Sequence, residues 1–133
     1  MNKIYWYGIR VIKNNRNKNS ERTMENVLSP DIFSLENELI DTSRHLVNNI
    51  KNMENIVKAR IMINGEEYEN AILTLKEVLD EDPDNLEALN DITVAYILNG
   101  NSLTAMGTIY RVLELDQNND IAIDNLNYLK ARQ

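Results

Sequence analysis

The sequence contains no cysteine, only two prolines and four glycines, and a single histidine among its 133 residues. Without cysteine the chain can form neither a disulfide framework nor a thiolate metal site. Few prolines and glycines favour long helices over many tight turns. No apolar run approaches the ~20 residues that a membrane-spanning helix needs. No small-residue cleavage site follows the apolar stretch near the start, so we expect no secretory signal and a cytoplasmic protein.

Charge is distributed unevenly along the chain. The net charge is −7, but residues 1–23 hold six lysines and arginines against one acid, so they carry +5 and the remaining residues carry −12. A basic arm on an acidic body can dock on its own body, on a neighbouring molecule or on an anionic surface. The body would repel nucleic acid and the short arm lacks a folded basic motif, so we expect no nucleic-acid binding.

A repeat of 34 residues occupies the second half of the chain. The segment YENAILTLKEVLDEDPDNLEAL (68–89) matches SLTAMGTIYRVLELDQNNDIAI (102–123) without a gap. Apolar character is kept at positions such as Leu75 and Ile109 or Val78 and Val112, and the turn residues Asp82 and Asn85 recur as Asp116 and Asn119. A single register held over more than twenty residues predicts a repeat architecture.

Each repeat has the pattern of two antiparallel helices. The spacing of apolar residues predicts amphipathic helices, and the segments with this spacing are residues 69–82, 86–100, 103–115 and 120–132. Pro83 cannot continue the first of them, and Asn99-Gly100 is a natural helix end. We therefore expect an all-α solenoid of antiparallel helix pairs.

The residues before the repeats are predicted to be helical as well. Ser29-Pro30-Asp31 is a good helix start, and Leu39, Leu46 and Met53 recur every seven residues after it. One long helix to about residue 63 and two helices with a break at residues 41–43 both fit this pattern. In either case we expect this region to cap the first repeat, within a helical domain of residues 29–133.

An N-terminal arm and linker, residues 1–28, is expected to precede that domain. Residues 13–27 are polar, whereas residues 4–12, IYWYGIRVI, contain three aromatic residues. Residues 4–12 can pack on the solenoid, join two copies into a homo-oligomer, or act as an arm that binds a membrane surface or a partner. The sequence leaves these three possibilities open.

Residues 80–91, DEDPDNLEALND, carry acids at the first, third, fifth and last positions of a twelve-residue loop, as a calcium loop does. A calcium loop also needs glycine at its sixth position and glutamate at its twelfth, where this chain has Asn85 and Asp91. The stretch Asp82-Pro83-Asp84 recurs in register as Asp116-Gln117-Asn118. Because turn chemistry common to both repeats explains the acids, we expect no metal site.

Other candidate catalytic residues are equally weak. His45 lies on a polar stretch of predicted helix, without a second histidine or a serine nucleophile pattern. No carboxylate is isolated among apolar residues, where an acid with a raised pKa is expected. We therefore expect neither an enzyme nor a cofactor. Gly107 lies inside a predicted helix and costs about 1 kcal/mol relative to alanine, so we expect close helix packing there.

The repeat resembles the tetratricopeptide repeat family. With residue 86 as the first of a repeat, Leu89, Ile92 and Tyr96 take the large apolar positions of its first helix, and Ala105 takes the small position of the second. Pro83 matches the turn proline of the family, although Gln117 replaces it one repeat later. The resemblance covers residues 50–132 and implies about two and a half repeats.

The resemblance also implies a function in protein binding. In such solenoids the first helices of successive repeats line a concave groove, so we expect an adaptor or co-chaperone that binds a protein or peptide partner there. The ligand-facing positions of the family map onto Asn52, Asn55, Ala59, Met62, Glu87, Asn90, Val94, Ile97, Ile121, Asp124 and Tyr128. These positions lack the lysines and arginines with which some members hold a terminal carboxylate. A peptide of apolar and basic character is therefore favoured.

Two alternatives to an adaptor stay open. The chain can be an accessory domain of an enzyme system, because its repeats resemble those that accompany bacterial glycosyltransferases. It can also be a self-assembling structural protein, in which another copy, or a terminal segment of the chain itself, occupies the groove.

Overall fold

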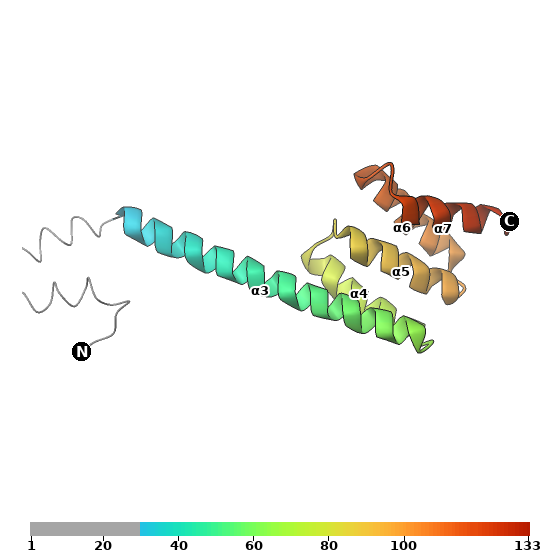
Figure 1. The fold of residues 1–133 in the computed structure, drawn as a ribbon, viewed down its shortest axis with the longest axis horizontal. Coiled ribbons are helices and arrows are strands. Elements are labelled where there is room, and N and C mark those ends of the chain that lie inside the picture. Colours follow the sequence, from blue (N-terminus) through green and yellow to red (C-terminus); the bar gives the residue numbers. More distant parts are fainter. Residues whose placement is uncertain (1–29) are drawn as a thin grey trace, which may run out of the picture. The chain divides into compact units, whose positions relative to one another are not determined.

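A computed structural model describes residues 30–133, which form five helices and no strand (Figure 1). The helices are α3 (Pro30–Asn64), α4 (Tyr68–Glu81), α5 (Leu86–Leu98), α6 (Ser102–Leu115) and α7 (Asp120–Lys130). The expected all-α helix-pair architecture is thus confirmed for this part of the chain. The predicted arm and linker, residues 1–28, lie outside the described residues. The chain divides into two units, residues 1–47 and residues 48–133, and α3 contributes to both.

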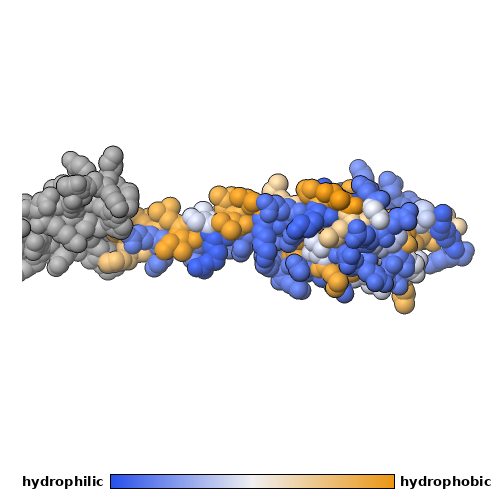
Figure 2. Space-filling model, turned by 90° about the horizontal axis from the view of Figure 1, so that it is seen from below, coloured by the Kyte–Doolittle hydropathy of each residue, from blue (hydrophilic) through white to orange (hydrophobic). Residues whose placement is uncertain are grey.

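Helix α3 is one continuous helix, which decides between the two possibilities that the sequence left open. The chain does not break at residues 41–43, and within this stretch Thr42 donates its hydroxyl hydrogen to the Glu38 carbonyl one turn earlier, at 2.8 Å. Its large apolar residues between Phe33 and Val47 are exposed, and hydrophobic surface is visible along it in Figure 2. That this region caps the first repeat stays a prediction.

The second half of α3 packs with the four shorter helices around one core. Helix α5 packs against both α4 and α6, and α7 packs against α6 and α5. Because α5 lies between other helices, seven of its thirteen residues are buried. The buried apolar residues of the core are Ile56, Ala59, Ala71, Ile72, Leu75, Val78, Ala88, Leu89, Ile92, Ala95, Tyr96, Ala105, Ile109, Val112, Ala122 and Leu129.

The α4–α5 and α6–α7 turns have the same hydrogen bonds. In the first, Asn85 donates its side-chain amide to Asp82 Oδ2 at 3.1 Å and accepts from the Ala88 N–H at 2.9 Å. In the second, Asn119 donates to Asp116 Oδ2 at 3.2 Å and accepts from the Ala122 N–H at 3.1 Å. Each asparagine therefore caps the N-terminus of the following helix.

Most acids of residues 80–91 make contacts within the domain. Asp82 holds the capping asparagine of the turn. Asp84 pairs with Arg111 of α6, whereas Glu87 and Asp91 pair with Arg60 of α3. Among the residues described, no group of three His, Cys, Asp or Glu side chains is gathered as a metal ion would need.

Gly107 does not lie in a close contact between helices. It is exposed in α6, and a Cβ built on it would meet no atom within 4 Å. The prediction that close packing requires this glycine was therefore wrong. Gly100 is different, because it adopts φ of +83° after the end of α5, in the left-handed region that favours glycine.

Candidate protein-binding surface

The first helices of the repeats, α5, α7 and the second half of α3, hold all the predicted groove residues. These residues differ widely in exposure. Asn52, Ala59 and Asn90 are buried; Asn55, Met62, Val94 and Ile97 are half-buried; Glu87, Ile121, Asp124 and Tyr128 are exposed. Asn52 and Asn90 are only 6% exposed and Ala59 is fully enclosed. A partner can therefore reach the four exposed and the four half-buried residues on the folded domain, but not the three buried ones.

An ion-pair cluster joins α3 to α5. Arg60 Nε donates to Asp91 Oδ2 at 2.6 Å, and Arg60 Nη2 donates to Glu87 Oε2 at 3.2 Å. Burial raises the pKa of Asp91 above its ordinary value, although the neighbouring Arg60 guanidinium acts in the opposite direction. Glu87, a predicted ligand-facing residue, is thus already engaged by Arg60 within the domain.

A neutral contact joins α5 to the start of α7. Asn90 Nδ2 donates to Asn119 Oδ1 at 3.2 Å, the same oxygen that caps α7. Within the described part of the chain, buried Asn90 Oδ1 and Asn125 Nδ2 have no hydrogen-bond partner. Asn90 therefore connects α5 to the start of α7, and its side chain is buried and not exposed in the groove.

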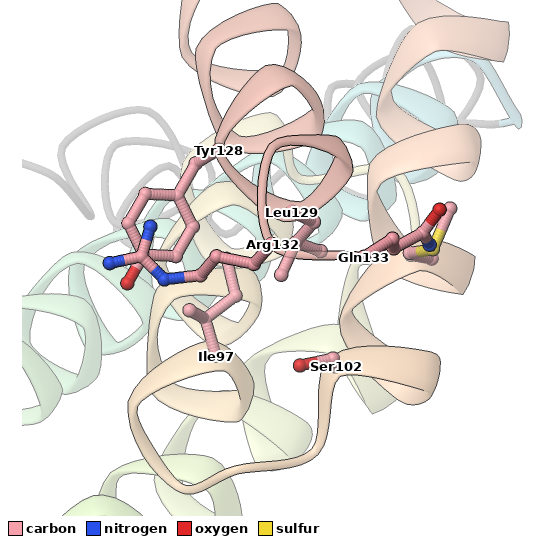
Figure 3. A pocket seen from close by; sticks show the side chains of 7 residues that line it. Ile97, Ser102, Tyr128, Leu129, Arg132 and Gln133 are labelled. Carbon is pink, nitrogen blue, oxygen red and sulfur yellow. The ribbon is translucent and has the colours of Figure 1, made fainter.

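Two predicted residues, Ile97 of α5 and Tyr128 of α7, meet at a pocket of about 260 Å³ (Figure 3). Ser102 and Met106 of α6, Leu129 of α7, and the C-terminal residues Arg132 and Gln133 complete its lining. The Arg132 guanidinium lies 3.8 Å from the centroid of the Tyr128 ring, the geometry of a cation–π contact. Gln133 Nε2 lies 3.8 Å from Met106 Sδ.

The pocket combines an apolar floor with polar groups at its edge. Ile97, Met106 and Leu129 offer aliphatic and thioether contacts, and the Arg132 guanidinium and the Ser102 hydroxyl can donate hydrogen bonds. This mixture is typical of a site that accepts one apolar side chain and a neighbouring carbonyl or carboxylate.

Two arginines important for this surface were missed from the sequence. Arg132 follows Tyr128 by four residues in the helix predicted for residues 120–132, and this i,i+4 spacing of an aromatic residue and a cation was a usable signal, although α7 ends at Lys130. Arg60 meets Glu87 and Asp91 across two helices. No local spacing reveals such a pair, because it depends on the packing of α3 against α5.

The tetratricopeptide repeat model matches residues 65–131, which is half of the chain. The chain belongs to the tetratricopeptide repeat family. The predicted resemblance is thereby confirmed, and the family is one of protein-interaction modules that are typically non-catalytic. Searches of curated proteins and of solved structures found no match. Within residues 30–133, no helix is long and apolar enough to cross a membrane.

Proposed function

We propose that this tetratricopeptide repeat protein is an adaptor or co-chaperone of the cytoplasm that binds a peptide segment of a partner protein on its first helices. The reachable predicted residues of this surface are Asn55, Met62, Glu87, Val94, Ile97, Ile121, Asp124 and Tyr128. The pocket beside Tyr128 carries the proposal, because it joins two predicted groove residues from different helices into one concave site.

The chemistry of the site defines the peptide that it would accept. An apolar side chain fits against Ile97 and Leu129 in the pocket. One face of the Arg132 guanidinium lies on the Tyr128 ring. Its N–H groups point along the plane of the guanidinium, so they can donate hydrogen bonds to a peptide carbonyl or carboxylate. Asp124 is exposed one turn before Tyr128 on α7, so a basic residue next to the apolar one would gain a charge contact.

A display library of random peptides tests this proposal without knowledge of the partner. We expect the full chain to select peptides that share an apolar residue next to a basic one. Introducing a charge at the pocket by Ile97→Glu should weaken binding of the selected peptides roughly tenfold or more, since a buried apolar anchor dominates such interfaces. Binding would be followed by isothermal titration calorimetry.

The matched control is Leu73→Glu, which introduces the same charge at an exposed leucine of α4 that does not line the pocket. Peptide affinity of this variant should equal that of the wild type. Equal affinity of the Ile97→Glu variant, with its helical content unchanged, would refute the proposal that the groove binds these peptides.

A further inference from the structure

One face of the second half of α3 is apolar and exposed. Four side chains, each 51 to 67% exposed, form what is called the α3 face below: Ile50, Met53, Val57 and Ile61. Glu54 and Lys58 lie beside them around an open hollow of about 580 Å³, and Figure 2 shows hydrophobic patches on the surface of the protein. All these residues belong to the unit of residues 48–133. Exposed apolar surface of this kind marks an interaction site.

The turn after α3 has the same hydrogen bonds as the turn after α5, 34 residues later. The Glu67 N–H donates to the Met62 carbonyl at 2.8 Å, and the Asn101 N–H donates to the Tyr96 carbonyl at 2.8 Å. The residue before each donor has a positive φ, 64° in the first turn and 83° in the second. The 34-residue register therefore extends into α3, and each residue of its second half corresponds to the α5 residue 34 positions later.

Met53 and Val57 occupy the positions at which α5 meets the preceding first helix. They correspond to Glu87 and Asp91 of α5, and Arg60 of α3 bonds to both of these acids. The same two positions therefore face a neighbouring first helix at the α3–α5 junction. On α3 both positions are apolar and open to solvent.

Ile61 occupies a position that is buried in the later first helices. Its equivalents are Ala95 of α5 and Leu129 of α7, which are 0 and 4% exposed, whereas Ile61 is 67% exposed. Helix α7 packs against α6 and α5, so helices of the preceding repeat bury this position. Within residues 48–133 no helix precedes α3, and the α3 face is therefore an open junction of the kind that is closed at α5 and α7.

Two charged residues beside the α3 face restrict what can close this junction. Glu54 and Lys58 are exposed and correspond to Ala88 and Ile92 of α5, which are 0 and 2% exposed on a helix that packs against α4, the preceding second helix. A second helix placed over Glu54 and Lys58 would remove water from two charges. The positions that meet a first helix, in contrast, are entirely apolar. The α3 face therefore fits a single helix and not a helix pair.

We propose that the α3 face binds one amphipathic α-helix of a partner protein, which lies beside α3 as α3 lies beside α5. At the place from which Arg60 reaches the acids of α5, the partner would carry an aliphatic or aromatic residue, because Met53 and Val57 offer no charge. Its apolar residues would follow the i, i+3, i+4, i+7 spacing of a helix that binds in a groove. Glu54 and Lys58 at the edge carry opposite charges, which favours a partner helix without an excess of either sign.

This inference goes beyond the proposed peptide binding, because no residue of the α3 face is among the predicted groove residues. A display library of stabilised amphipathic helices of about 15 residues, selected on the full chain, tests it. We expect selected helices with an apolar stripe of helical spacing. Val57→Glu should weaken their binding roughly tenfold or more, measured by isothermal titration calorimetry. Because Val57 is 55% exposed, the helical content of this variant in circular dichroism should equal that of the wild type.

Two control variants separate the α3 face from other surfaces. Leu73→Glu adds the same charge to an exposed leucine of α4 and should leave the affinity for the selected helices unchanged. Ile97→Glu, which impairs the proposed peptide pocket, should also leave it unchanged. Helices that lose affinity for Ile97→Glu but not for Val57→Glu would support the peptide pocket and refute binding at the α3 face.

The double variant Glu54→Ala/Lys58→Ala tests whether a single helix binds. Its affinity for the selected helices should differ from that of the wild type by less than about threefold, since charges at the rim contribute little. A rise of tenfold or more would show that a bound helix covers these charges, and would refute the proposed position of the helix.

Two further outcomes would overturn the proposal. The first is a selection in which no helix depends on Val57. The second is self-association of the wild type in sedimentation equilibrium that Val57→Glu abolishes, because a second copy of the chain would then occupy the α3 face in place of a partner protein.

Discussion

The two junctions between successive first helices use different chemistry at equivalent places. At the α3–α5 junction, Arg60 holds Asp91 and Glu87. In the 34-residue repeat register the residues that correspond to Arg60, Asp91 and Glu87 at the α5–α7 junction are Val94, Asn125 and Ile121. The cation and both acids are thus replaced together, and a neutral bond from Asn90 to Asn119 joins the helices instead. Successive repeats keep the apolar register while their polar contacts differ as a whole set, and Asp91, whose side chain is 19% exposed, would be destabilising without its cation.

The largest expected effect comes from removing the neutral contact. Asn119→Ala deletes the cap of α7 and leaves the buried Asn90 amide without its acceptor. Loss of a cap costs about 1 kcal/mol and an unpaired buried donor about 1–3 kcal/mol, so the free energy of unfolding should fall by roughly 2–4 kcal/mol. Urea denaturation followed by circular dichroism measures it.

Asn85→Ala is the matched control for that loss. It removes the equivalent cap of α5 and the same bond to an aspartate, and we expect a loss of about 1 kcal/mol. Equal losses in the two variants would contradict a role for Asn90 in joining α5 to α7.

The charged junction should be the next most sensitive. Arg60→Met leaves Asp91, whose side chain is 19% exposed, without its cation. A carboxylate left in such a place is destabilising, but the Arg60 side chain is 49% exposed and solvent screens the pair. We therefore expect a loss of about 1–2 kcal/mol at neutral pH. Arg111→Met removes an exposed arginine from Asp84 and Glu114 and should leave the urea midpoint unchanged; a similar loss there would contradict any special role of the α3–α5 junction.

The pH dependence of stability should distinguish the junctions further. Burial raises the pKa of Asp91 above its ordinary 3.8, so the folded state binds this proton more tightly than the unfolded state. The favourable contribution of the protonated acid is complete below the ordinary value and is lost as pH rises through the folded pKa. Between the ordinary pKa and the folded pKa of Asp91, the unfolding free energy of Asp91→Asn should therefore decrease less with rising pH than that of the wild type. The unfolding free energy of Arg60→Met should decrease more. Urea midpoints from pH 3 upward would measure both slopes, and parallel curves for wild type and Asp91→Asn would contradict the raised pKa.

The fold was largely predictable because it depends on periodic apolar residues. Leu75 and Ile109, 34 residues apart, are both fully enclosed, and the capping roles of Asn85 and Asn119 follow from residues within three positions of each. Only near neighbours in sequence decide such features, and these were visible in the repeat.

The site was less predictable because contacts across helices decide which groove positions stay open. Asn90 occupies a ligand-facing position of the family, yet it turns to Asn119 and is buried. The pocket beside Tyr128 is also lined by Ser102 and Met106 of α6. Helix α6 is the second helix of a repeat, and the expectation that first helices line the groove does not include it. Ile97 and Tyr128, both on first helices of repeats, are the two predicted residues that line this pocket, and their role in binding stays a prediction.

The smallest expected effect is a gain in stability outside both junctions. A Cβ at Gly107 would meet nothing within 4 Å, so Gly107→Ala should raise the free energy of unfolding by about 0.5–1 kcal/mol through higher helix propensity. Gly100→Ala is the control of opposite sign, because its φ of +83° is strained for alanine although space is available. Urea denaturation of both variants measures the two signs. Neither glycine belongs to the α3–α5 or α5–α7 contacts. Neither change should therefore alter the difference in unfolding free energy between Asn119→Ala and Asn85→Ala. A loss of stability in Gly107→Ala would mean that α6 packs more tightly there than its exposure indicates.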